Sequence, residues 1–598
     1  MCGIMGYVGD ENAVDVIING LEYLEYRGYD SAGIALNINN DTKIIKCTGS
    51  PSNLRDKTKE FFANVGIGHN RWATHGCANE TNAHPHISKN KLFTVVHNGI
   101  IENFLEIKSD LIKKGYSFVS STDTEVVAHL LEENYNGDLK GTVTSTLSFL
   151  KGSYALGIIC KDYPDIIVCA KNSSPLFIGT GTNCSVLASD ITALSRKSDR
   201  IFRLNDGEIG FLSKEGLRVY DNEGCRIRKT EVKIKSSDDP KNKEGYNHYM
   251  LKEIYEQPFA IRRTLNEICS GKKIHFKGLR WTENEIKNIN SVHFIACGSA
   301  YHAGMVGAYA CEELFRRKSS AEIASEFRYR SPHLDNNSLV IIISQSGETA
   351  DTLAALRIAK EKGAKIISIV NVENSTIAME SDCVILTKAG KEVAVATTKA
   401  YSAQLTVIYT LIIYLSVLSG EMNKKTAGSL IDELKEIPEK VKLILNSNYN
   451  YKEIANKILK SEYICFIGRK YGYCTATEAS LKLKEISYIP CEAYAAGELK
   501  HGTISLIDNK SLIIALNCSK EMKTKMESNI EEASARGAEI LSISTNQIKN
   551  NINIPETIDF FYPLLEIIPL QLIAYYTALE KNCEIDKPRN LAKSVTVE

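Results

Sequence analysis

The sequence predicts an α/β protein with several domains, and three observations lead to this fold class. A chain of 598 residues is too long for a single hydrophobic core. Its N-terminal part contains short strand-like runs separated by Gly, Asn and Asp, which is typical of a layered α+β domain. The rest of the chain alternates buried strands with helices, and this pattern occurs twice. We therefore expect one layered α+β domain and two copies of a doubly wound parallel α/β domain.

The strand-like runs of the first domain end before a polar segment. These runs are "LFTVVHNG", "YALGIIC", "DIIVCA", "CSVLAS" and "RIFRL". The polar segment, "KSSDDPKNKEGYN" from Lys235, has the composition of a linker. We place the first domain at residues 1–234 and the linker at residues 235–247.

An internal repeat divides the remaining residues. "GAKIISIVN" begins at Gly363 and "GAEILSIST" begins at Gly537, 174 positions later. "QLTVIYT" from Gln404 matches "QLIAYYT" from Gln571, 167 positions later, and upstream "VHFIACG" matches "YICFIGR". A shared order of strands and helices at nearly constant spacing indicates that one domain was duplicated. We expect the first copy, with a leading helix, at residues 248–425, the second copy at 450–582 and a C-terminal tail at 583–598.

The composition limits the classes of function. Lys and Arg number 72, as do Asp and Glu, so the zero formal net charge excludes a broad cationic surface for nucleic acid or anionic membranes. The first ten residues, "MCGIMGYVGD", contain no basic segment and no long apolar core, so they do not read as a signal peptide. The apolar run "LTVIYTLIIYLSVL" from Leu405 is short and interrupted, which predicts a buried helix rather than a membrane span.

The 16 cysteines indicate a reducing compartment. None follow the C-x-x-C spacing, so zinc ribbons and thioredoxin-like redox sites have no support. Most lie in apolar stretches, where a free cysteine packs as a small hydrophobic residue. So many unpaired thiols are typical of the cytosol. We expect a cytoplasmic protein with no metal site.

Cys2 is placed where its own backbone amine can take part in chemistry. Once Met1 is removed, Cys2 carries both a thiol and a free α-amino group. The reference pKa of an α-amine, about 7.7–8.0, lies close to the thiol value of about 8.5, so the amine can accept the thiol proton near neutral pH. We expect Cys2 to be a nucleophile whose base is its own amine.

Four loop motifs of the first domain crowd polar residues between apolar runs: "GHNRWATHG", "NAHPH", "HNGIIEN" and "STDTE". Taken singly, each has an ordinary interpretation. Asn98-Gly99 alone is typical of a hairpin turn, and Arg71 alone is typical of a surface ion pair. Three histidines of these loops form only a weak zinc candidate, because no Cys or Asp accompanies them at ligand spacing: His75, His84 and His86.

Taken with Cys2, the same loops supply the parts of an amide-hydrolysing site. The Asn98 side-chain N–H and the Gly99 backbone N–H could form an oxyanion hole. Arg71 can bind an α-carboxylate in a bidentate manner, and Asp123 can balance an α-ammonium group. A substrate that carries both groups and an amide is glutamine.

The first domain resembles the class II glutamine amidotransferases, which are N-terminal nucleophile hydrolases. The resemblance rests on "CGIMGYVG", on "YRGYDSAG" from Tyr26 and on the four loop motifs. It implies that Cys2 attacks the glutamine amide and releases ammonia, with Trp72 as the candidate gate toward the second site. It also implies a glutamine pocket lined by Arg71, Trp72, Thr74, His75, Gly99 and Asp123.

A hydroxyl-rich loop in the first repeat follows a strand and opens a helix. The strand "SLVIII" runs into "SQSGETADT", which contains Ser344, Ser346, Gly347 and Thr349. Backbone amides at a helix start and hydroxyl donors can hold a phosphate, although an N-cap cluster alone is equally compatible. The chain contains no G-x-x-x-x-G-K-[ST] motif, so a magnesium–nucleoside triphosphate site is not expected.

A helix in the second repeat carries charges on one face. Within "TATEASLKLKEIS" from Thr475, residues Glu478, Lys482 and Glu485 share a face because of their i, i+4 and i+7 spacing. An exposed salt-bridge face is the ordinary interpretation, but flanking apolar residues favour a pocket. We expect Ser480, Lys484 and Ser487 on the opposite side to face solvent.

Further motifs extend the resemblance over the whole chain. They are "IACGSAYHAG", "SEFRYR", "SQSGETADT", "ATTKAYSAQL", "LKLKEISYIPCEAYAAGELKHG" and "PRNLAKSVTVE", and they are similar to the glutamine–fructose-6-phosphate aminotransferase (isomerising) family. The repeats then correspond to sugar isomerase domains. The resemblance implies L-glutamine and D-fructose 6-phosphate as substrates, no cofactor or metal, and a homodimer or a larger oligomer.

The same resemblance assigns roles in the sugar site. His501 opens the sugar ring, Glu485 moves a proton between C1 and C2, and Lys593 forms a Schiff base at C2. Lys482 assists in that pocket. The sugar phosphate is held by Ser299, Ser344, Gln345, Ser346 and Thr349.

Two positions depart from the family pattern. Cys297-Gly298-Ser299-Ala300 stands where many members read C-G-T-S, so one hydroxyl contact is lost, and Thr503 replaces a usual proline. Both changes concern ligand affinity rather than the proton-transfer groups.

Three other functions would each require features of their own. An amidophosphoribosyltransferase would need a phosphoribosyl-diphosphate loop with paired acidic residues, and an asparagine synthetase would need a glycine-rich ATP loop. A sugar-phosphate sensor with a vestigial glutaminase would not need Cys2, Lys482, Glu485, His501 and Lys593 together. Formation of hexosamine phosphate from glutamine and fructose 6-phosphate distinguishes these functions.

Overall fold

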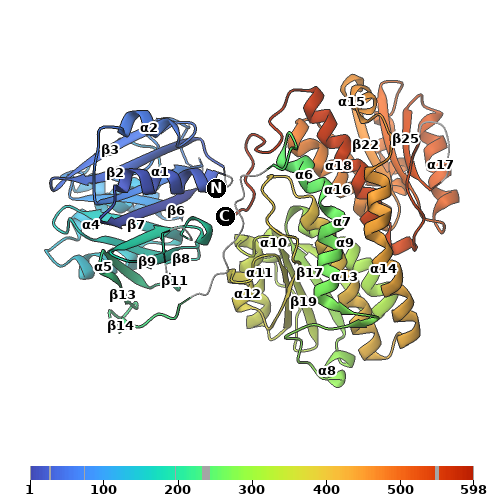
Figure 1. Cartoon of the computed structure of the whole chain (residues 1–598), viewed down its shortest axis with the longest axis horizontal. Helices are drawn as coiled ribbons and strands as arrows, with labels where there is room; N and C mark the ends of the chain where they lie inside the picture. The colour runs from blue at the N-terminus through green and yellow to red at the C-terminus, as the bar shows by residue number, and fades with distance from the viewer. Residues whose placement is uncertain are drawn as a thin grey trace. The chain divides into compact units, whose positions relative to one another are not determined.

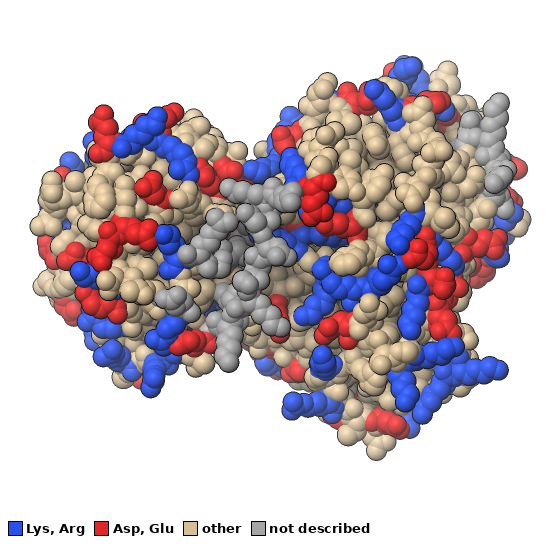
Figure 2. Space-filling model, viewed as in Figure 1, with Lys and Arg blue, Asp and Glu red and all other residues tan. Residues whose placement is uncertain are grey.

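The protein is described by a computed structural model covering residues 2–25, 28–72, 75–194, 197–198, 200–231, 243–545 and 551–596. It divides into two compact units (Figure 1). The first unit comprises residues 1–239 and 592–598, and the second comprises residues 240–591. Acidic and basic side chains are interspersed over the visible face of each unit (Figure 2), as the balanced composition predicts.

Two antiparallel seven-stranded sheets form the centre of the first unit. Their strand orders are β11-β9-β10-β1-β4-β2-β3 and β14-β13-β12-β8-β7-β6-β5. The strands are β1 (Gly3–Gly9), β2 (Ser31–Ile38), β3 (Asp41–Thr48), β4 (Val65–Arg71), β5 (His86–Ile87), β6 (Phe93–Ile101), β7 (Gly152–Cys160), β8 (Ile167–Asn172), β9 (Phe177–Gly181), β10 (Cys184–Ala188), β11 (Arg200–Arg203), β12 (Ile209–Ser213), β13 (Gly216–Tyr220) and β14 (Arg226–Ile227).

The two sheets pack face to face and helices cover their outer faces, which gives four layers (Figure 1). Side chains that alternate along β1 face two different hydrophobic cores. Ile4 and Val8 join the core between the sheets, whereas Met5 and Tyr7 join the core under α1. The helices are α1 (Ala13–Leu24), α2 (Asn53–Thr58), α3 (Phe104–Lys113), α4 (Glu125–Glu133), α5 (Leu139–Phe149) and η2 (Ile191–Ala193).

The second unit contains two parallel five-stranded sheets with the same topology. Their orders are β18-β17-β19-β20-β21 and β23-β22-β24-β25-β26. The first uses β17 (Ser291–Ala296), β18 (Lys318–Ile323), β19 (Ser338–Ser344), β20 (Lys365–Val370) and β21 (Cys383–Leu386). The second uses β22 (Tyr463–Gly468), β23 (Glu492–Ala495), β24 (Ser511–Asn517), β25 (Glu539–Ser544) and β26 (Asn551–Asn553), and a separate hairpin joins β15 (Cys269–Ser270) and β16 (Lys273–Ile274). The predicted duplication of a doubly wound domain is therefore confirmed.

Helices connect the strands and fill the space between the two sheets of the second unit (Figure 1). In the first half they are α6 (Tyr249–Tyr255), α7 (Gln257–Ile268), α8 (Glu283–Lys287), α9 (Gly298–Ala310), η3 (Cys311–Phe315), α10 (Ala324–Phe327), α11 (Ala350–Glu361), α12 (Thr376–Glu380), α13 (Lys399–Ser419) and α14 (Lys424–Leu445). In the second half they are α15 (Tyr451–Lys460), α16 (Tyr471–Ser487), η4 (Ala496–His501), η5 (Thr503–Leu506), α17 (Lys523–Ser534), η6 (Asp559–Phe561) and α18 (Pro563–Glu580).

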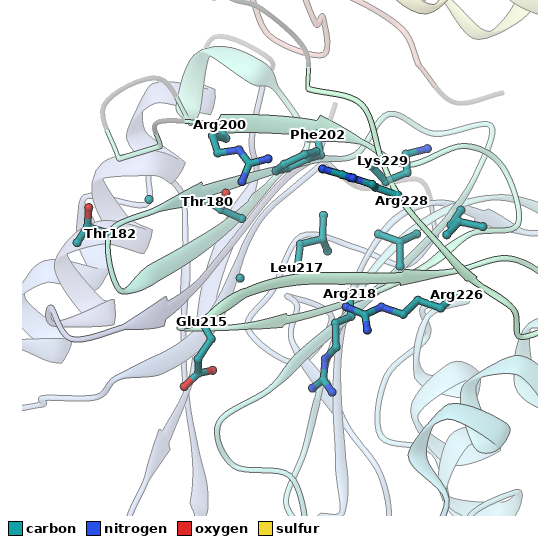
Figure 3. A pocket seen from close by; sticks show the side chains of 14 residues that line it. Thr180, Thr182, Arg200, Phe202, Glu215, Leu217, Arg218, Arg226, Arg228 and Lys229 are labelled. Atoms are coloured by element: carbon teal, nitrogen blue, oxygen red, sulfur yellow. The ribbon is translucent and has the colours of Figure 1, made fainter.

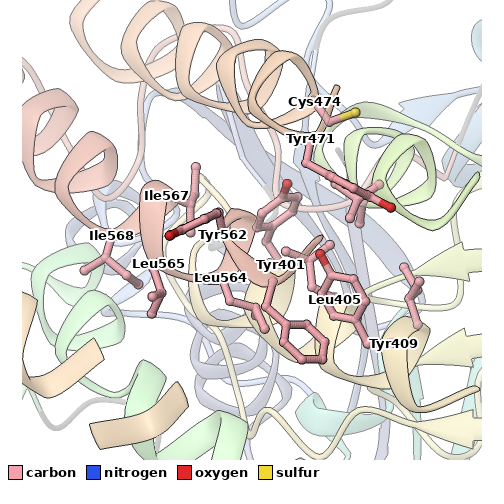
Figure 4. Packing of buried hydrophobic residues seen from close by; sticks show 14 of the residues in the cluster. Tyr401, Leu405, Tyr409, Tyr471, Cys474, Tyr562, Leu564, Leu565, Ile567 and Ile568 are labelled. Carbon is pink, nitrogen blue, oxygen red and sulfur yellow. The ribbon is translucent and has the colours of Figure 1, made fainter. Parts of the chain in front are cut away.

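One continuous core joins the two repeats. Side chains of α13, α16 and α18 pack together there, as Figure 4 shows for Tyr401, Tyr471 and Leu564 among others. The apolar run from Leu405 lies in α13, which begins six residues earlier than the run and is long and apolar enough to cross a membrane. Its length therefore does not exclude a span, contrary to the sequence prediction, but 78% of its most apolar window is buried in the protein, as in a core helix.

The C-terminal tail is anchored to the second unit at Asp586. The Asp586 carboxylate accepts the backbone N–H groups of Tyr249 and Met250, each at 2.9 Å, at the start of α6. Its carbonyl accepts the N–H of Val395 at 3.0 Å, and the Arg589 N–H donates to the Tyr488 hydroxyl at 2.7 Å. The described part of the tail after α18 contains no helix or strand, in agreement with the absence of helical periodicity in its sequence.

Candidate active sites

Cys2 lies at the interface of the two sheets of the first unit. It precedes β1, and the register Gly3↔Asn70 places it beside the end of β4. The Trp72 backbone N–H donates to Cys2 Sγ at 3.2 Å. Burial raises the pKa of the Cys2 thiol above its usual value, and the Trp72 N–H opposes that rise because it stabilises the thiolate. The thiol therefore needs a base to reach its reactive form.

Asn98 reaches Cys2 from the opposite sheet. Its Nδ2 donates to the Cys2 carbonyl oxygen at 3.2 Å. Asn98 and Gly99 lie within β6, paired with β7, so the hairpin-turn interpretation of this dipeptide is wrong. Gly99 has a φ of +129°, and a Cβ there would lie 2.0 Å from the Ser153 carbonyl oxygen. Only glycine fits this position.

His69 is a site residue whose role sequence reasoning missed. It is fully buried on β4, and its Nε2 lies 2.9 Å from Asn98 Oδ1. Burial lowers the pKa of His69 to about 3, so the ring is neutral at working pH. Because Asn98 Oδ1 can only accept, Nε2 carries the proton and fixes the Asn98 amide with Nδ2 toward Cys2. The residue lies in "GHNRWATHG", but the sequence carries no signal for this pairing.

His69 belongs to a histidine cluster made of His69, His84, His86 and His97. The rings of His69 and His84 stack at 4.2 Å, and those of His84 and His86 meet edge to face at 4.8 Å. Burial lowers the pKa of every member. Within the described ranges, the structure has no group of three or more His, Cys, Asp or Glu side chains that could hold a metal.

Arg71 is buried at the end of β4, so the surface ion-pair interpretation is wrong. Its guanidinium donates to the carbonyl oxygens of His75, Gly76 and Cys77, the last two at 3.1 and 3.3 Å. Asp30 Oδ1 lies 3.8 Å from Arg71 Nη1. Arg71 thus holds the loop that contains His75, and Asp30, which the sequence reasoning did not single out, balances its charge.

Other predicted glutamine-site residues lie on neighbouring segments. Asp123 is buried, and its Oδ2 accepts the Ile101 backbone N–H at 2.8 Å. Trp72 and His75 are half-exposed, and the His75 ring packs edge to face on Phe104 at 5.2 Å. The sequence-predicted Thr74 lies outside the described residues.

The predicted phosphate loop lies at the switch point of the first parallel sheet. The chain leaves β17 for β18 on one side and returns to β19 on the other, so a crevice forms at the carboxyl ends of β17 and β19. The residues after β19 form a tight turn before α11, in which the Gly347 N–H donates to Ser344 Oγ and Ser344 Oγ lies 3.0 Å from Thr349 Oγ1. Gln345 and Ser346 are half-exposed there, and Ser299 lies at the start of α9, after β17.

The charges on α16 form a buried network with α9. Lys482 Nζ lies 2.6 Å from Glu485 Oε2 and 3.4 Å from Glu478 Oε1. Ser299 Oγ accepts from Lys482 Nζ at 3.0 Å and donates to Glu478 Oε1 at 2.8 Å. His302 Nδ1 lies 2.8 Å from Glu478 Oε2. We call these five residues the charged cluster.

Pairing keeps Lys482 and Glu478 ionised despite their burial. Burial alone lowers the pKa of Lys482, but Glu478 and Glu485 outweigh it and raise the pKa above its usual value. Burial alone raises the pKa of Glu478, but Lys482 and His302 outweigh it and lower the pKa. Lys482 is therefore a permanent cation rather than a base.

Three predictions about this region have different outcomes. Ser480 and Ser487 are buried, so the expected solvent face of α16 is wrong for both: the helix packs against α9 of the first copy and against α18. His501 is exposed at the end of η4, and no hydrogen bond or ion pair of its side chain is found in the described part of the chain. Lys593 falls in the segment that groups with the first unit, whereas Lys482 belongs to the second.

The chain is similar to known families and proteins. A family model described as "Glutamine amidotransferase domain" matches residues 69–196, and one described as "SIS domain" matches residues 285–414 and 457–581. A Clostridium tetani protein named glutamine–fructose-6-phosphate aminotransferase (isomerizing) is 46% identical over all of both chains, and a Thermus thermophilus protein of the same name is 41% identical over all of both chains. The solved C-terminal domain of glucosamine-fructose-6-phosphate aminotransferase from Francisella tularensis is 36% identical, with a TM-score of 0.56, and covers 58% of this chain and 99% of its own.

Proposed function

The chain belongs to the glutamine–fructose-6-phosphate aminotransferase (isomerizing) family, and from this premise we propose how its residues divide the reaction. The protein hydrolyses L-glutamine and transfers the ammonia to D-fructose 6-phosphate, and it isomerises the product to D-glucosamine 6-phosphate. The first half of this reaction uses the site around Cys2, and the second half uses the charged cluster and the phosphate loop.

The Cys2 thiolate attacks the glutamine amide carbon, and ammonia leaves. The observation that supports this role most directly is the convergence of Trp72 N–H and the Asn98 side chain on Cys2, at 3.2 Å each. Since burial raises the pKa of the thiol, a base must remove its proton. The free α-amine of Cys2 is that base, because every histidine of the histidine cluster is held neutral and none contacts Sγ among the described contacts.

The oxyanion that forms on the amide carbonyl is stabilised by Asn98 Nδ2 and the Gly99 N–H. His69 is a positioning residue for this step. Its Nε2–H holds Asn98 Oδ1, so Nδ2 is already directed toward Cys2 before glutamine binds. A donor that needs no reorientation stabilises the transition state without a reorganisation cost.

The glutamine backbone is held by charges on both sides of the thiol. Arg71 provides the cation for the α-carboxylate, and Asp123 provides the anion for the α-ammonium. Trp72, Thr74 and His75 complete the pocket. Arg71 also fixes the loop carbonyls at residues 75–77, which supports a closed position of that loop over glutamine.

The sugar is held by its phosphate at the crevice between β17 and β19. Ser344, Gln345, Ser346 and Thr349 donate to the phosphate oxygens at the start of α11, and Ser299 lies at the neighbouring strand end. Lys482 Nζ lies 2.6 Å from Glu485 Oε2 and holds the Glu485 side chain in position.

The sugar chemistry proceeds from an open-chain ketose. His501 assists ring opening, and the Lys593 amine condenses with the C2 carbonyl with loss of water. Ammonia replaces the lysine at C2, and Glu485 removes a proton from C1 and returns it to C2. Support for His501 and Lys593 comes from the family resemblance of their motifs.

We also propose a cytoplasmic homodimer. All sixteen cysteines are free thiols in the structure, in agreement with a reducing compartment. Sedimentation equilibrium of the full chain tests the dimer, and a single species at 66.4 kDa would contradict it.

A coupled assay with glutamine labelled with ¹⁵N at the amide tests the proposed role of Lys593 in the C-terminal tail. Lys593→Arg and deletion of Arg589–Glu598 should each reduce glucosamine 6-phosphate formation by more than about 10³-fold, because a guanidinium forms no imine. Basal glutamine hydrolysis should persist in both variants, and Asp586 keeps its contacts with the start of α6. Synthesis near the parent rate in either variant would show that Lys593 is not the Schiff-base residue.

A further inference from the structure

Several arginines line a cavity of about 690 Å³ in the first unit, but they do not converge on one point (Figure 3). Side chains alternate along β13 and β14, and Val219 pairs with Ile227 across these strands. Leu217, Val219 and Ile227 pack on the core between the two sheets, so Arg218 and Arg226 lie on the opposite face of the strands. In the charged cluster, by contrast, the side chains lie within hydrogen-bond or ion-pair distance of one another.

Two members of the charged cluster, His302 and Glu478, have no part in the proposed reaction. His302 lies on α9 of the first copy, one turn after Ser299, and Glu478 lies on α16 of the second copy. The Glu478 side chain is fully buried, so both oxygens of its carboxylate need donors from the protein. Burial raises the pKa of Glu478, but its partners in the cluster outweigh this effect and keep the side chain ionised.

The α9 helix supplies one donor to each oxygen of this carboxylate. Ser299 Oγ donates to Glu478 Oε1 at 2.8 Å, and His302 Nδ1 lies 2.8 Å from Glu478 Oε2. Because a carboxylate only accepts, His302 Nδ1 carries the proton and donates it. The two donors are three residues apart, so they lie on the same face of α9. Glu478 is therefore held by the first copy although it belongs to the second.

Lys482 lies between two carboxylates that compete for it. Its Nζ is 2.6 Å from Glu485 Oε2 but 3.4 Å from Glu478 Oε1. Within the described residues, Glu485 has no other recorded ion pair, whereas Glu478 also has the two donors of α9. Since these donors already satisfy the Glu478 oxygens, Lys482 is left to pair closely with Glu485.

We propose that His302 is a positioning residue for the sugar chemistry: by donating to Glu478, it keeps Lys482 directed toward Glu485. This inference rests on the proposed role of Glu485 in moving a proton between C1 and C2. Without His302, one oxygen of a buried carboxylate loses its donor and draws Lys482 away from Glu485. The phosphate loop stays in place, so the loss concerns kcat rather than the KM for fructose 6-phosphate.

Four variants of the full-length protein test this role. His302→Leu removes the donor, and His302→Asn keeps an N–H group near the position of Nδ1. A double variant, His302→Leu with Glu478→Gln, also removes the charge that competes for Lys482, so it leaves no unpaired buried anion. His293→Leu is the matched control, because it removes a 3.0 Å contact between a histidine and Glu322 in the same copy but outside the charged cluster. The two histidine side chains are similarly exposed, 18% for His293 and 15% for His302.

We expect His302→Leu to lower kcat of glucosamine 6-phosphate formation by about 10- to 100-fold, with the KM for fructose 6-phosphate within about threefold of the parent. His302→Asn and the double variant should both recover most of kcat, and His293→Leu should keep the parent value. Glutamine hydrolysis should be the same in all four variants. Parent kcat in His302→Leu, or failure of both His302→Asn and the double variant to recover it, would overturn the inference. The double variant gives this answer even if His302→Leu alone does not fold.

Glu485→Gln separates this inference from the proposed function on which it rests. It should lower glucosamine 6-phosphate formation by more than about 10³-fold, because an amide cannot accept the C1 proton. Synthesis near the parent rate in Glu485→Gln would contradict the proposed proton transfer, and the role of His302 with it. Loss of synthesis in Glu485→Gln together with parent kcat in His302→Leu would contradict the role of His302 alone.

Discussion

The histidine cluster beside Cys2 and the charged cluster on α16 are both buried polar groups, yet burial affects their ionisation in opposite ways. In the first unit, burial lowers the pKa of His69 to about 3 and the ring stays neutral. In the second unit, Lys482 and Glu478 are just as buried and both stay charged. Burial alone therefore does not predict the protonation of a buried side chain.

The difference in ionisation comes from the side chains that surround each buried group. His69 has an amide and other imidazoles around it, so nothing compensates the loss of hydration of a charged ring. Lys482 has two carboxylates within 3.4 Å, and Glu478 has Lys482 and His302. Neutral donors suit a site where charge develops only during the reaction. Fixed charges suit a site that must hold a carboxylate ready for proton transfer.

The largest contrast should come from removing the nucleophile. Cys2→Ala should lower glutamine hydrolysis by about 10⁴- to 10⁶-fold, because none of the histidines beside Cys2 can supply a thiolate. Conversion of fructose 6-phosphate to glucose 6-phosphate without glutamine, which uses only the sugar site, should continue. Both rates are measured on one preparation, and residual hydrolysis within tenfold of the parent would contradict the assignment of Cys2.

Breaking the charged cluster should affect both activity and stability. Lys482→Met leaves Glu478 buried without its cation, so we expect the second unit to lose about 3–5 kcal/mol in urea unfolding and sugar conversion to be lost. Glutamine hydrolysis should persist.

A double variant separates these two effects. Adding Glu478→Gln to Lys482→Met removes the unpaired buried charge, so it should recover most of the stability but none of the activity. If Lys482→Met unfolds at the same urea concentration as the parent, the pair is not the buried ion pair described here.

His69→Ala tests the histidine cluster and should lower activity less than Cys2→Ala does. Release of the Asn98 amide should lower the kcat of glutamine hydrolysis by about 10- to 100-fold, with little change in KM, because the donor acts in the transition state. His69→Gln keeps an N–H donor and should restore most of kcat.

His84→Ala is the matched control, since His84 is equally buried in the cluster but its recorded hydrogen bond accepts from His97 and not from Asn98. A decrease in kcat of equal size in His84→Ala, or no rescue by His69→Gln, would indicate a purely structural role for His69.

The smallest predicted effect is that of pH on the stability of each unit, and its sign differs between the two units. His69 is neutral in the folded state down to about pH 3 but protonates near 6.5 when unfolded. The first unit should therefore lose about 1.4 kcal/mol per pH unit for each such histidine as pH falls below 6.5. In the second unit, burial raises the pKa of Glu566 to about 7, so its contribution to stability grows as pH falls from 7 toward 4.5.

Pulse proteolysis in urea at pH 7.0 and 5.5, with fragments identified by mass spectrometry, reports the two units separately. The first unit should unfold at lower urea at pH 5.5, and the second should not. Glu566→Gln should remove the acid stabilisation of the second unit. Parallel losses in both units would show that the buried histidines and Glu566 do not set the pH dependence of stability in the two units.

Periodicity and repetition in the sequence were sufficient to predict the fold. Equivalent strings such as those from Gly363 and Gly537 fall on equivalent strands, β20 and β25, in two sheets of the same order. The solvent face of α16 was the exception. Ser480 and Ser487 were expected outside because polar residues usually face water, but this helix of the second copy also packs against α9 of the first copy and has no full solvent face.

The residue types of the candidate sites could be predicted, but their pairings could not. Asn98 was singled out from its motif, whereas its partner His69 lies 29 residues earlier on a strand of the other sheet. The contact between His302 and Glu478 spans 176 residues and joins the two repeats. Such pairings depend on how sheets and helices pack, and one sequence carries no signal of that packing.

The Asp586 anchor acts as a tether for the end of the chain. Lys593 follows it by seven residues, and an extended chain spans at most about 3.3–3.6 Å per residue, so the lysine stays within about 25 Å of the start of α6. A short tether of this kind holds a reactive group at an effective concentration in the millimolar range. The length of chain between Asp586 and Lys593 thus sets the volume that the Lys593 amine can reach, whatever the concentration of the protein.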